Sequence, residues 1–286
     1  MISKIRNIAS QLESAYPKDE ALALAWWMAE ELSGLSRTQL LCGCKDTTFL
    51  ANTQVFVDRL LHFEPIQYIF GHTIWNNLDL KVTPATLIPR PETAELVDRI
   101  IEVSKSRGLE ISVLDIGTGS GCIAIALKKA HPEWQVTGID ISAEAIEVAK
   151  ENAKRNNVEV EFQIADIFNL QSPISDLQYD IVVSNPPYIC ESEKVSMNPN
   201  VLNYEPSTAL FVPDNDPLRF YRRIAELFTN RKSIIDNPLC LFFEINEAYA
   251  TEIENLLREE NYKNIRIHRD VYGKPRIAEG VLLSDV

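Results

Sequence analysis

The chain has 286 residues, of which 45% are hydrophobic and 24% are charged, as in an ordinary globular protein with a sizeable core. It carries 28 Lys and Arg against 41 Asp and Glu, which gives a formal net charge of −13 at pH 7. Lys and Arg supply most of the affinity of proteins for phosphate backbones, so this charge argues against a large nucleic-acid-binding face. A small molecule or a basic protein is a compatible partner.

The sequence also argues against a membrane protein and against a metal-binding protein. No apolar run approaches the ~20 residues of a membrane helix, and the polar N-terminus lacks a signal-peptide pattern. We therefore expect a cytoplasmic protein that does not bind membranes. The five cysteines are scattered without a C-x-x-C pair, and the four histidines show no ligand spacing. No metal site is expected.

Residues 1–72 are expected to form a small helical domain. Ile5, Ile8 and Leu12 recur at helical spacing, and Gly34 is placed to end a second helix. Ser36 with Gln39 predicts a capping box for a third helix. A fourth helix is expected to stop at Glu64-Pro65.

Residues 73–88 are expected to form a β-hairpin linker to a second domain, residues 89–286. Ile74, Leu78 and Leu80 alternate with polar residues around Asn76-Asn77, which predicts two strands and a tight turn.

From Ile111 onward, predicted strands and helices alternate, which is typical of a parallel sheet with crossover helices. The predicted strands cover 113–116, 136–139, 160–164, 179–183, 239–245, 262–268 and 276–283. Helices are predicted to begin after the first two of these strands and to cover 218–228 and 247–259. Residues 191–215 are polar and contain several prolines, and we expect them to form a long loop.

A glycine-rich turn follows the first strand, with the sequence Gly117-Thr118-Gly119-Ser120-Gly121 after Asp115. Glycine permits a tight strand-to-helix turn and lets a ligand approach the backbone closely. A dinucleotide fingerprint would need a third glycine at position 122, where Cys122 stands. The spacing resembles that of S-adenosylmethionine-dependent methyltransferases. A turn with a purely structural role is the alternative.

Two aspartates end the next strands, and ligands of such sheets bind at the carboxyl ends of strands. Asp140 lies about 20 residues beyond the loop, where a carboxylate can accept hydrogen bonds from ribose hydroxyls. Asp166 is placed to accept from the adenine amino group, with Ile167 packing near the ring. Either residue alone could be a solvated strand end, but together with the loop they predict an adenosine site.

The fourth strand ends in Asn185-Pro186-Pro187-Tyr188, which predicts the class of the acceptor. The Asn185 side-chain oxygen and the Pro186 carbonyl can accept both hydrogens of an NH₂ group, and Tyr188 can stack on a planar group. Such contacts would align the nitrogen with a sulfonium methyl group and stabilise its developing charge. We expect Asn185, Pro186 and Tyr188 to be catalytic, all four residues to bind substrate, and Asn185 also to approach the donor. An ordinary proline turn is the alternative.

The Asn-Pro-Pro-Tyr sequence resembles a motif of methyltransferases that act on planar amino groups, either adenine in nucleic acid or glutamine in protein. Four further motifs favour one of these two acceptors: Glu64 to Gly71, Pro84 to Thr93, Tyr204-Glu205-Pro206, and Tyr272 to Arg276. Together with the helical N-terminal domain, they resemble the peptide-chain release factor N5-glutamine methyltransferases (the PrmC/HemK family) over essentially the whole chain. The resemblance implies an α/β fold with a Rossmann-like class I methyltransferase sheet. It also implies methylation of the glutamine in the Gly-Gly-Gln motif of class I release factors, with S-adenosylmethionine as donor.

The helical domain has no chemical motif, and we expect it to dock the protein substrate. Two other functions remain open. A nucleic-acid adenine N6-methyltransferase shares the glycine loop and the Asn-Pro-Pro-Tyr motif but needs a basic face. A non-catalytic S-adenosylmethionine-binding protein would have no need of Asn185.

Overall fold

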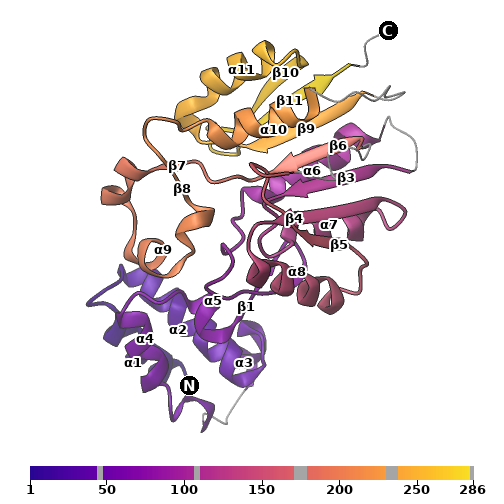
Figure 1. Cartoon of the computed structure of the whole chain (residues 1–286). Helices are drawn as coiled ribbons and strands as arrows, with labels where there is room; N and C mark the ends of the chain where they lie inside the picture. The colour runs from indigo at the N-terminus through magenta and orange to yellow at the C-terminus, as the bar shows by residue number, and fades with distance from the viewer. Residues whose placement is uncertain (44–47, 106–109, 171–178, 230–237, 284–286) are drawn as a thin grey trace. The chain divides into compact units, whose positions relative to one another are not determined.

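The computed structural model describes residues 1–43, 48–105, 110–170, 179–229 and 238–283. The chain forms two compact units. One consists of Met1–Gly71 and Asn198–Tyr204, and the other of His72–Met197 and Glu205–Val286. Figure 1 shows the chain coloured from its N-terminus to its C-terminus.

The smaller unit is helical. Its elements are α1 (Ile2–Leu12), α2 (Lys18–Ser33), α3 (Arg37–Gly43), η1 (Thr48–Leu50), α4 (Gln54–Leu61), α5 (Ile66–Phe70) and α9 (Pro199–Tyr204). Gly34 ends α2 in the left-handed conformation, as predicted. The predicted capping box of α3 is also present, because Ser36 N lies 2.9 Å from Gln39 Oε1 and Gln39 N lies 3.4 Å from Ser36 Oγ.

Helix α5 was not predicted from the sequence. The fourth helix ends at Leu61, and α5 begins directly after Pro65. Proline has no N–H to donate, and its fixed φ suits the first turn of a helix, so Pro65 precedes a new helix.

The predicted hairpin is present as β1 (His72–Trp75) and β2 (Leu78–Lys81), and the buried apolar residue of β1 is Trp75 rather than Ile74. Asn76 and Asn77 form the turn with φ of 46° and 60°, as a two-residue hairpin turn requires. Trp75 pairs with Leu78, and paired residues share a face of the hairpin. Trp75 is therefore buried, whereas Ile74 is 68% exposed.

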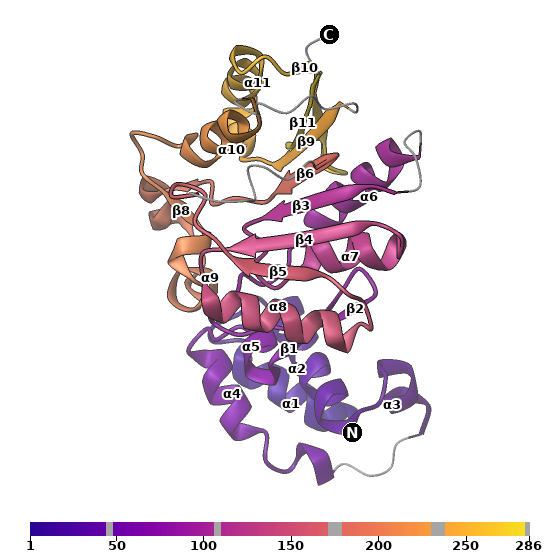
Figure 2. The same ribbon diagram turned by 45° about the vertical axis from the view of Figure 1, so that its right-hand side comes forward.

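The larger unit is organised around a seven-stranded sheet of order β10-β11-β9-β6-β3-β4-β5 (Figure 2). Its strands are β3 (Ser112–Ile116), β4 (Gln135–Asp140), β5 (Glu161–Ile164), β6 (Ile181–Ser184), β9 (Leu239–Glu244), β10 (Lys263–Arg269) and β11 (Pro275–Leu282). Five neighbouring strands pair in parallel, in the order β5, β4, β3, β6 and β9. Strands β11 and β10 continue the sheet in antiparallel pairing. The predicted α/β class with a Rossmann-like sheet and a helical N-terminal part is confirmed.

Helices cover both faces of this sheet. They are α6 (Thr93–Ser104), α7 (Cys122–Ala130), α8 (Ala143–Arg155), α10 (Arg219–Thr229), and α11 (Ala250–Glu259), which follows the short η5 (Glu247–Tyr249). Residues of α6, α7 and α8 pack into one apolar core with the strands, and residues of α10 and α11 pack into the other. Because both faces are covered, every residue of β9 is buried.

The segment expected to be a long loop, residues 191–215, contains regular structure. It includes η3 (Glu191–Ser196), α9 and η4 (Ser207–Ala209). The short strands β7 (Ile189–Cys190) and β8 (Phe211–Val212) pair in parallel around it. Such short elements carry too weak a local pattern to be recognised in a polar sequence.

The domain boundaries expected from the sequence, 1–72, 73–88 and 89–286, stay a prediction. The compact units divide after Gly71, and the helical one also includes Asn198–Tyr204. The hairpin belongs to the larger unit, because Trp75, Leu78 and Leu80 are buried in one of its cores. No helix in the described ranges has the length and apolarity that crossing a membrane requires.

We predict that Gly138→Ala in β4 destabilises the fold. A Cβ there would lie 2.7 Å from ring carbons of Phe162 and 2.8 Å from Thr118 Oγ1. Both neighbours are buried, and overpacking of a core costs about 1–3 kcal/mol. Denaturant titration measures the loss. Gly280→Ala in β11 is the matched control, since its Cβ would approach Tyr262 only to 3.3 Å. Equal losses in both variants would contradict the prediction.

Candidate active site

The glycine loop between β3 and α7 is held in place by hydrogen bonds to β4 and within itself. The N–H groups of Gly117 and Thr118 donate to Ile139 O at 2.8 and 2.9 Å. Thr118 Oγ1 donates to the buried Asp115 carboxylate at 2.6 Å. The loop therefore has a fixed shape before any ligand binds.

The loop also leaves room for a ligand. Gly117 and Gly119 have φ of 71° and 54°, in the left-handed region that favours glycine. A Cβ on Gly117 would meet no atom within 4 Å, and one on Gly119 would meet only Gly117 O at 4.0 Å. The space beyond these residues is open, which fits the close approach of a ligand to the backbone.

Asp140 connects this loop to the start of α8. Its Oδ2 accepts a hydrogen bond from Gly119 N and its Oδ1 accepts one from Ser142 N, each at 2.9 Å. A carboxylate has about four lone-pair positions, so both oxygens can still accept from a ligand. Burial raises the pKa of Asp140, and these two N–H groups oppose that shift.

The segment after β5 also carries an aspartate that accepts hydrogen bonds, Asp166, but the next residue, Ile167, is buried. Asp166 accepts from Phe168 N at 2.9 Å and from Asn169 Nδ2 at 2.6 Å. Ile167 is 8% exposed and packs in a core of the sheet, so its contact with a bound ring stays a prediction. Ile141 directly follows Asp140 and is 64% exposed. The sequence analysis overlooked this apolar side chain beside a strand-end carboxylate.

Asn185 to Tyr188 follow β6 and are connected to two side chains that the sequence analysis overlooked. Asn185 Nδ2 lies 3.4 Å from Thr93 Oγ1, at the start of α6. Tyr188 OH lies 3.2 Å from Glu244 Oε1, at the end of β9. Glu244 lies one residue before the end of the strand predicted over 239–245, so the strand-end rule that selected Asp140 could have selected it too.

Glu244 is a buried carboxylate, 2% exposed. Burial raises its pKa, and the hydrogen bonds from Thr93 and Tyr188 and the positive charge of Arg276 oppose that shift. Burial and the nearby Glu244 raise the pKa of the Tyr188 hydroxyl well above its ordinary value. Tyr188 therefore stays protonated and donates to the carboxylate.

Two motifs that are distant in the sequence meet in the same unit. Glu205 is 6% exposed and accepts from Ile88 N at 3.1 Å and from Arg90 at 2.7 Å. Trp75 Nε1 donates to Arg90 O at 2.7 Å. The proline-rich segment before α6 is therefore anchored by a half-buried ion pair and by the hairpin.

The parallel strands bring the sequence-predicted residues to one edge of the sheet. Register pairs join Ile116 to Ile139, Ile116 to Ser184, and Ser184 to Phe243. The glycine loop, Asp140, Asn185 and Glu244 follow at the same carboxyl edge. We therefore regard this edge as the candidate active site.

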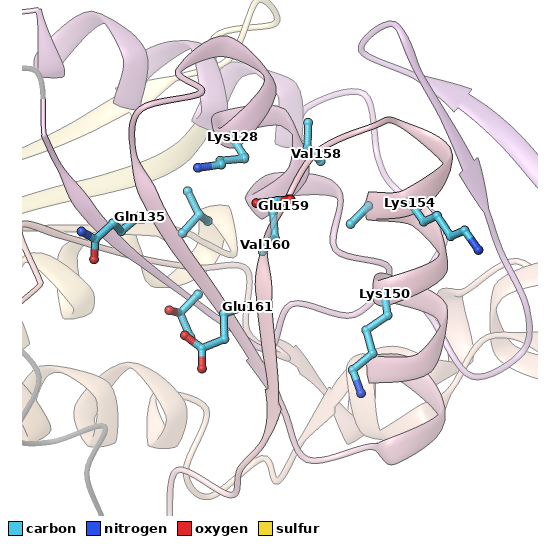
Figure 3. A pocket seen from close by; sticks show the side chains of 11 residues that line it. Lys128, Gln135, Lys150, Lys154, Val158, Glu159, Val160 and Glu161 are labelled. Carbon is cyan, nitrogen blue, oxygen red and sulfur yellow. The ribbon is translucent and has the colours of Figure 1, made fainter.

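A separate open pocket of about 670 Å³ lies at the opposite edge (Figure 3). Gln135 and Glu161, which begin β4 and β5, line it together with lysines of α7 and α8. Gln135 begins β4 and Asp140 ends it, so the pocket lies at the other end of the strand and is not the site described here. Within the described ranges, no group of three or more His, Cys, Asp or Glu side chains is arranged to hold a metal ion.

Comparisons with known proteins identify relatives of this chain. The Methyltransferase domain family matches residues 109–266, and the PrmC N-terminal domain family matches residues 4–71. A release factor glutamine methyltransferase from Bacteroides thetaiotaomicron is 42% identical over 94% of this chain and 96% of its own length. Another from Flavobacterium psychrophilum is 40% identical over 96% and 97%.

A solved structure shows the fold of the larger part of the chain. It is the hMettl16 catalytic domain in complex with a 3′UTR hairpin, with a TM-score of 0.55 and 17% identity. The similarity covers 73% of this chain and 77% of that one.

We predict that Asp115 makes stability fall as pH rises. Burial raises its pKa to about 7, against the opposing hydrogen bond from Thr118. Because the folded pKa exceeds the unfolded value of about 3.9, the contribution is fully present below about pH 4 and is lost as pH rises through about 7. Over that range this group lowers the free energy of unfolding by up to about 1.4 kcal/mol per pH unit.

Urea titrations at several pH values check this prediction. Asp115→Asn cannot ionise, so its stability should fall less steeply with pH than that of the wild type. Glu144→Gln changes an exposed carboxylate in α8 and should leave the wild-type slope unchanged. Parallel slopes for the wild type and Asp115→Asn would show that the buried carboxyl does not titrate in this range.

Proposed function

Since this chain belongs to the family of release factor glutamine methyltransferases, we propose that it methylates the side-chain amide nitrogen, N5, of the glutamine in the Gly-Gly-Gln motif of class I peptide chain release factors. S-adenosylmethionine is the proposed donor. The observation that carries the proposal is the placement of Asn185-Pro186-Pro187-Tyr188 at the same sheet edge as the glycine loop and Asp140.

The donor site would be formed by the glycine loop, Asp140 and Asp166. When bound, S-adenosylmethionine supplies an electrophilic methyl group on a sulfonium sulfur. Thr118 and Ser120 are 4% and 3% exposed, so the loop offers backbone rather than side chains to the ligand. The unused lone pairs of Asp140 suit ribose hydroxyls, and those of Asp166 suit the adenine amino group.

The acceptor site must orient a weak nucleophile, because the lone pair of an amide nitrogen is delocalised into the carbonyl group. Asn185 Oδ1 and the Pro186 carbonyl would accept the two amide hydrogens and hold the nitrogen in line with the methyl group. They would also stabilise the positive charge that develops on the nitrogen. Positioning and electrostatics are sufficient for this reaction, and we propose that no metal takes part.

Tyr188 would pack against the planar amide of the glutamine. Its hydroxyl is bound to Glu244, and its backbone oxygen accepts from Asn246 Nδ2 at 3.2 Å. Both ends of the residue are therefore fixed, so its ring is positioned before the substrate arrives.

We further propose that the helical unit docks the release factor. A glutamine side chain offers little surface, whereas a specific protein contact buries on the order of 1,200–2,000 Å² in total. The net charge of −13 would attract a protein with basic surface for ribosomal RNA. We place the reaction in the cytoplasm, where release factors act.

The net charge argues against the nucleic-acid alternative, and the Asn185 motif argues against a non-catalytic binding protein. A methylation assay with labelled donor separates the three functions. The purified protein should label a class I release factor at the Gly-Gly-Gln glutamine and should leave DNA and RNA unlabelled. Labelled nucleic acid would favour the adenine methyltransferase, and donor binding without any turnover would favour the binding protein.

We predict that Asn185→Ala lowers kcat by about a hundredfold or more, by analogy with the loss of an oxyanion-hole donor. Donor affinity should fall much less, because Asp140 and the loop are unchanged. Single-turnover kinetics and calorimetry measure the two effects. Asn255→Ala, at an exposed position in α11, is the control. A near-normal single-turnover rate in Asn185→Ala would mean that this side chain has only a structural role.

A second prediction concerns the donor. Losing a charged hydrogen-bond acceptor costs ~1.5–3 kcal/mol, so Asp140→Ala should weaken S-adenosylmethionine binding by roughly tenfold to a hundredfold. Part of this loss would come from the loop, since Gly119 N loses its acceptor. Glu144→Ala removes an exposed carboxylate from α8, the helix that follows Asp140, and should leave affinity unchanged. Unchanged affinity in Asp140→Ala by calorimetry would refute the assignment.

A further inference from the structure

The two polar side chains of the Asn-Pro-Pro-Tyr motif are connected to the same buried carboxylate. Glu244 Oε2 lies 2.7 Å from Thr93 Oγ1, which lies 3.4 Å from Asn185 Nδ2. Glu244 Oε1 lies 3.2 Å from Tyr188 OH. Thr93 and Glu244 are each 2% exposed, so water cannot replace these partners.

The number of hydrogens fixes the direction of these bonds. A hydroxyl has one hydrogen to donate, and an ionised carboxylate only accepts. Thr93 therefore donates to Glu244, and its lone pairs face Asn185. An amide presents either its NH₂ group or its oxygen, and only the NH₂ group can satisfy those lone pairs.

We propose that Thr93 and Glu244 are positioning residues that hold Asn185 with Nδ2 toward the protein and Oδ1 toward the acceptor amide, an inference that rests on the proposed methyl transfer. The opposite orientation of the Asn185 amide would place NH₂ against the NH₂ of the substrate. That arrangement would repel the acceptor and would bring two lone-pair acceptors together at Thr93.

Glu244 holds Tyr188 in the same way. The phenol hydroxyl has one hydrogen, which it donates to Oε1, and the ring is thereby held at one angle over the acceptor. Arg276 supports the arrangement, because its positive charge favours the ionised form of Glu244, although burial raises the pKa of that carboxyl. One buried carboxylate thus orients both the group that accepts the amide hydrogens and the ring beside them.

Thr93→Val tests the connection, since it removes the hydroxyl and keeps the shape. We expect kcat on release factor to fall about ten- to hundredfold, with little change in the KM for S-adenosylmethionine. Thr93→Ser keeps the hydroxyl and should restore kcat to within about threefold of the wild type. Thr137→Val, at a buried threonine of β4 that lines the separate pocket, controls for the loss of a buried hydroxyl. Equal activity of Thr93→Val and Thr93→Ser would overturn the proposal.

The double variant Thr93→Val with Asn185→Ala shows whether Thr93 acts through Asn185. If it does, the second substitution lowers kcat no further once Asn185 is absent. If the kcat losses of the two single variants multiply in the double variant, Thr93 acts independently of Asn185, and the proposal is overturned. Glu244→Gln is a second test of the connection. The NH₂ group of the glutamine can donate to Thr93, which reverses the direction of that hydrogen bond. This variant should therefore lower kcat as Thr93→Val does.

A spectroscopic measurement keeps this inference distinct from the proposed function. In protein labelled with ¹⁵N-asparagine, the signal absent from Asn185→Ala identifies the Asn185 side-chain amide. That signal should shift in Thr93→Val and return in Thr93→Ser, with or without turnover. An unmoved signal would refute the positioning role even if release factor is methylated. A shifted signal in a protein that does not methylate release factor would refute only the proposed substrate.

Discussion

The parallel pairing of β3 with β4 and β6, and of β6 with β9, is the constraint on which the site depends. Strands that run in one direction end at one edge, so residues more than a hundred positions apart in the sequence meet there. Asp140, Asn185 and Glu244 each follow directly from, or end, one of these strands. The apolar residues on both faces fix the position of every strand along its axis relative to its neighbours. They thereby fix the relative positions of the three side chains.

Burying carboxylates is the main free-energy cost of this arrangement. An ion removed from water needs hydrogen bonds or an opposite charge to offset the loss of hydration. Three buried carboxylates of the larger unit have such partners. Asp115 accepts from Thr118, Glu205 pairs with Arg90, and Glu244 accepts from two hydroxyls. Each of them holds a neighbouring segment in place: the glycine loop, the segment before α6, and the segment that follows β6.

Local patterns in the sequence predicted the elements that local interactions determine. The Ser36 capping box, the Asn76-Asn77 turn and the strand ends at Asp140 and Asn185 are examples, because each depends on residues within a few positions. The bond between Thr93 and Glu244 spans 151 positions, and that between Arg90 and Glu205 spans 115. The periodicity of apolar residues in a sequence cannot predict contacts between residues so far apart. The six-residue α9 was missed for a related reason, since so short a helix is not stable by itself and forms only through tertiary contacts.

The position of α9 has a consequence for the order in which the protein folds during synthesis. Asn198–Tyr204 belong to the helical unit, and Tyr204 OH donates to His62 O at 2.9 Å across 142 positions. Most of that unit leaves the ribosome early, because its other residues end at Gly71. It nevertheless lacks one helix until the glycine loop and the strands through β6 have also been translated. The N-terminal unit, although first in the sequence, is therefore completed only after most of the second unit has been synthesised.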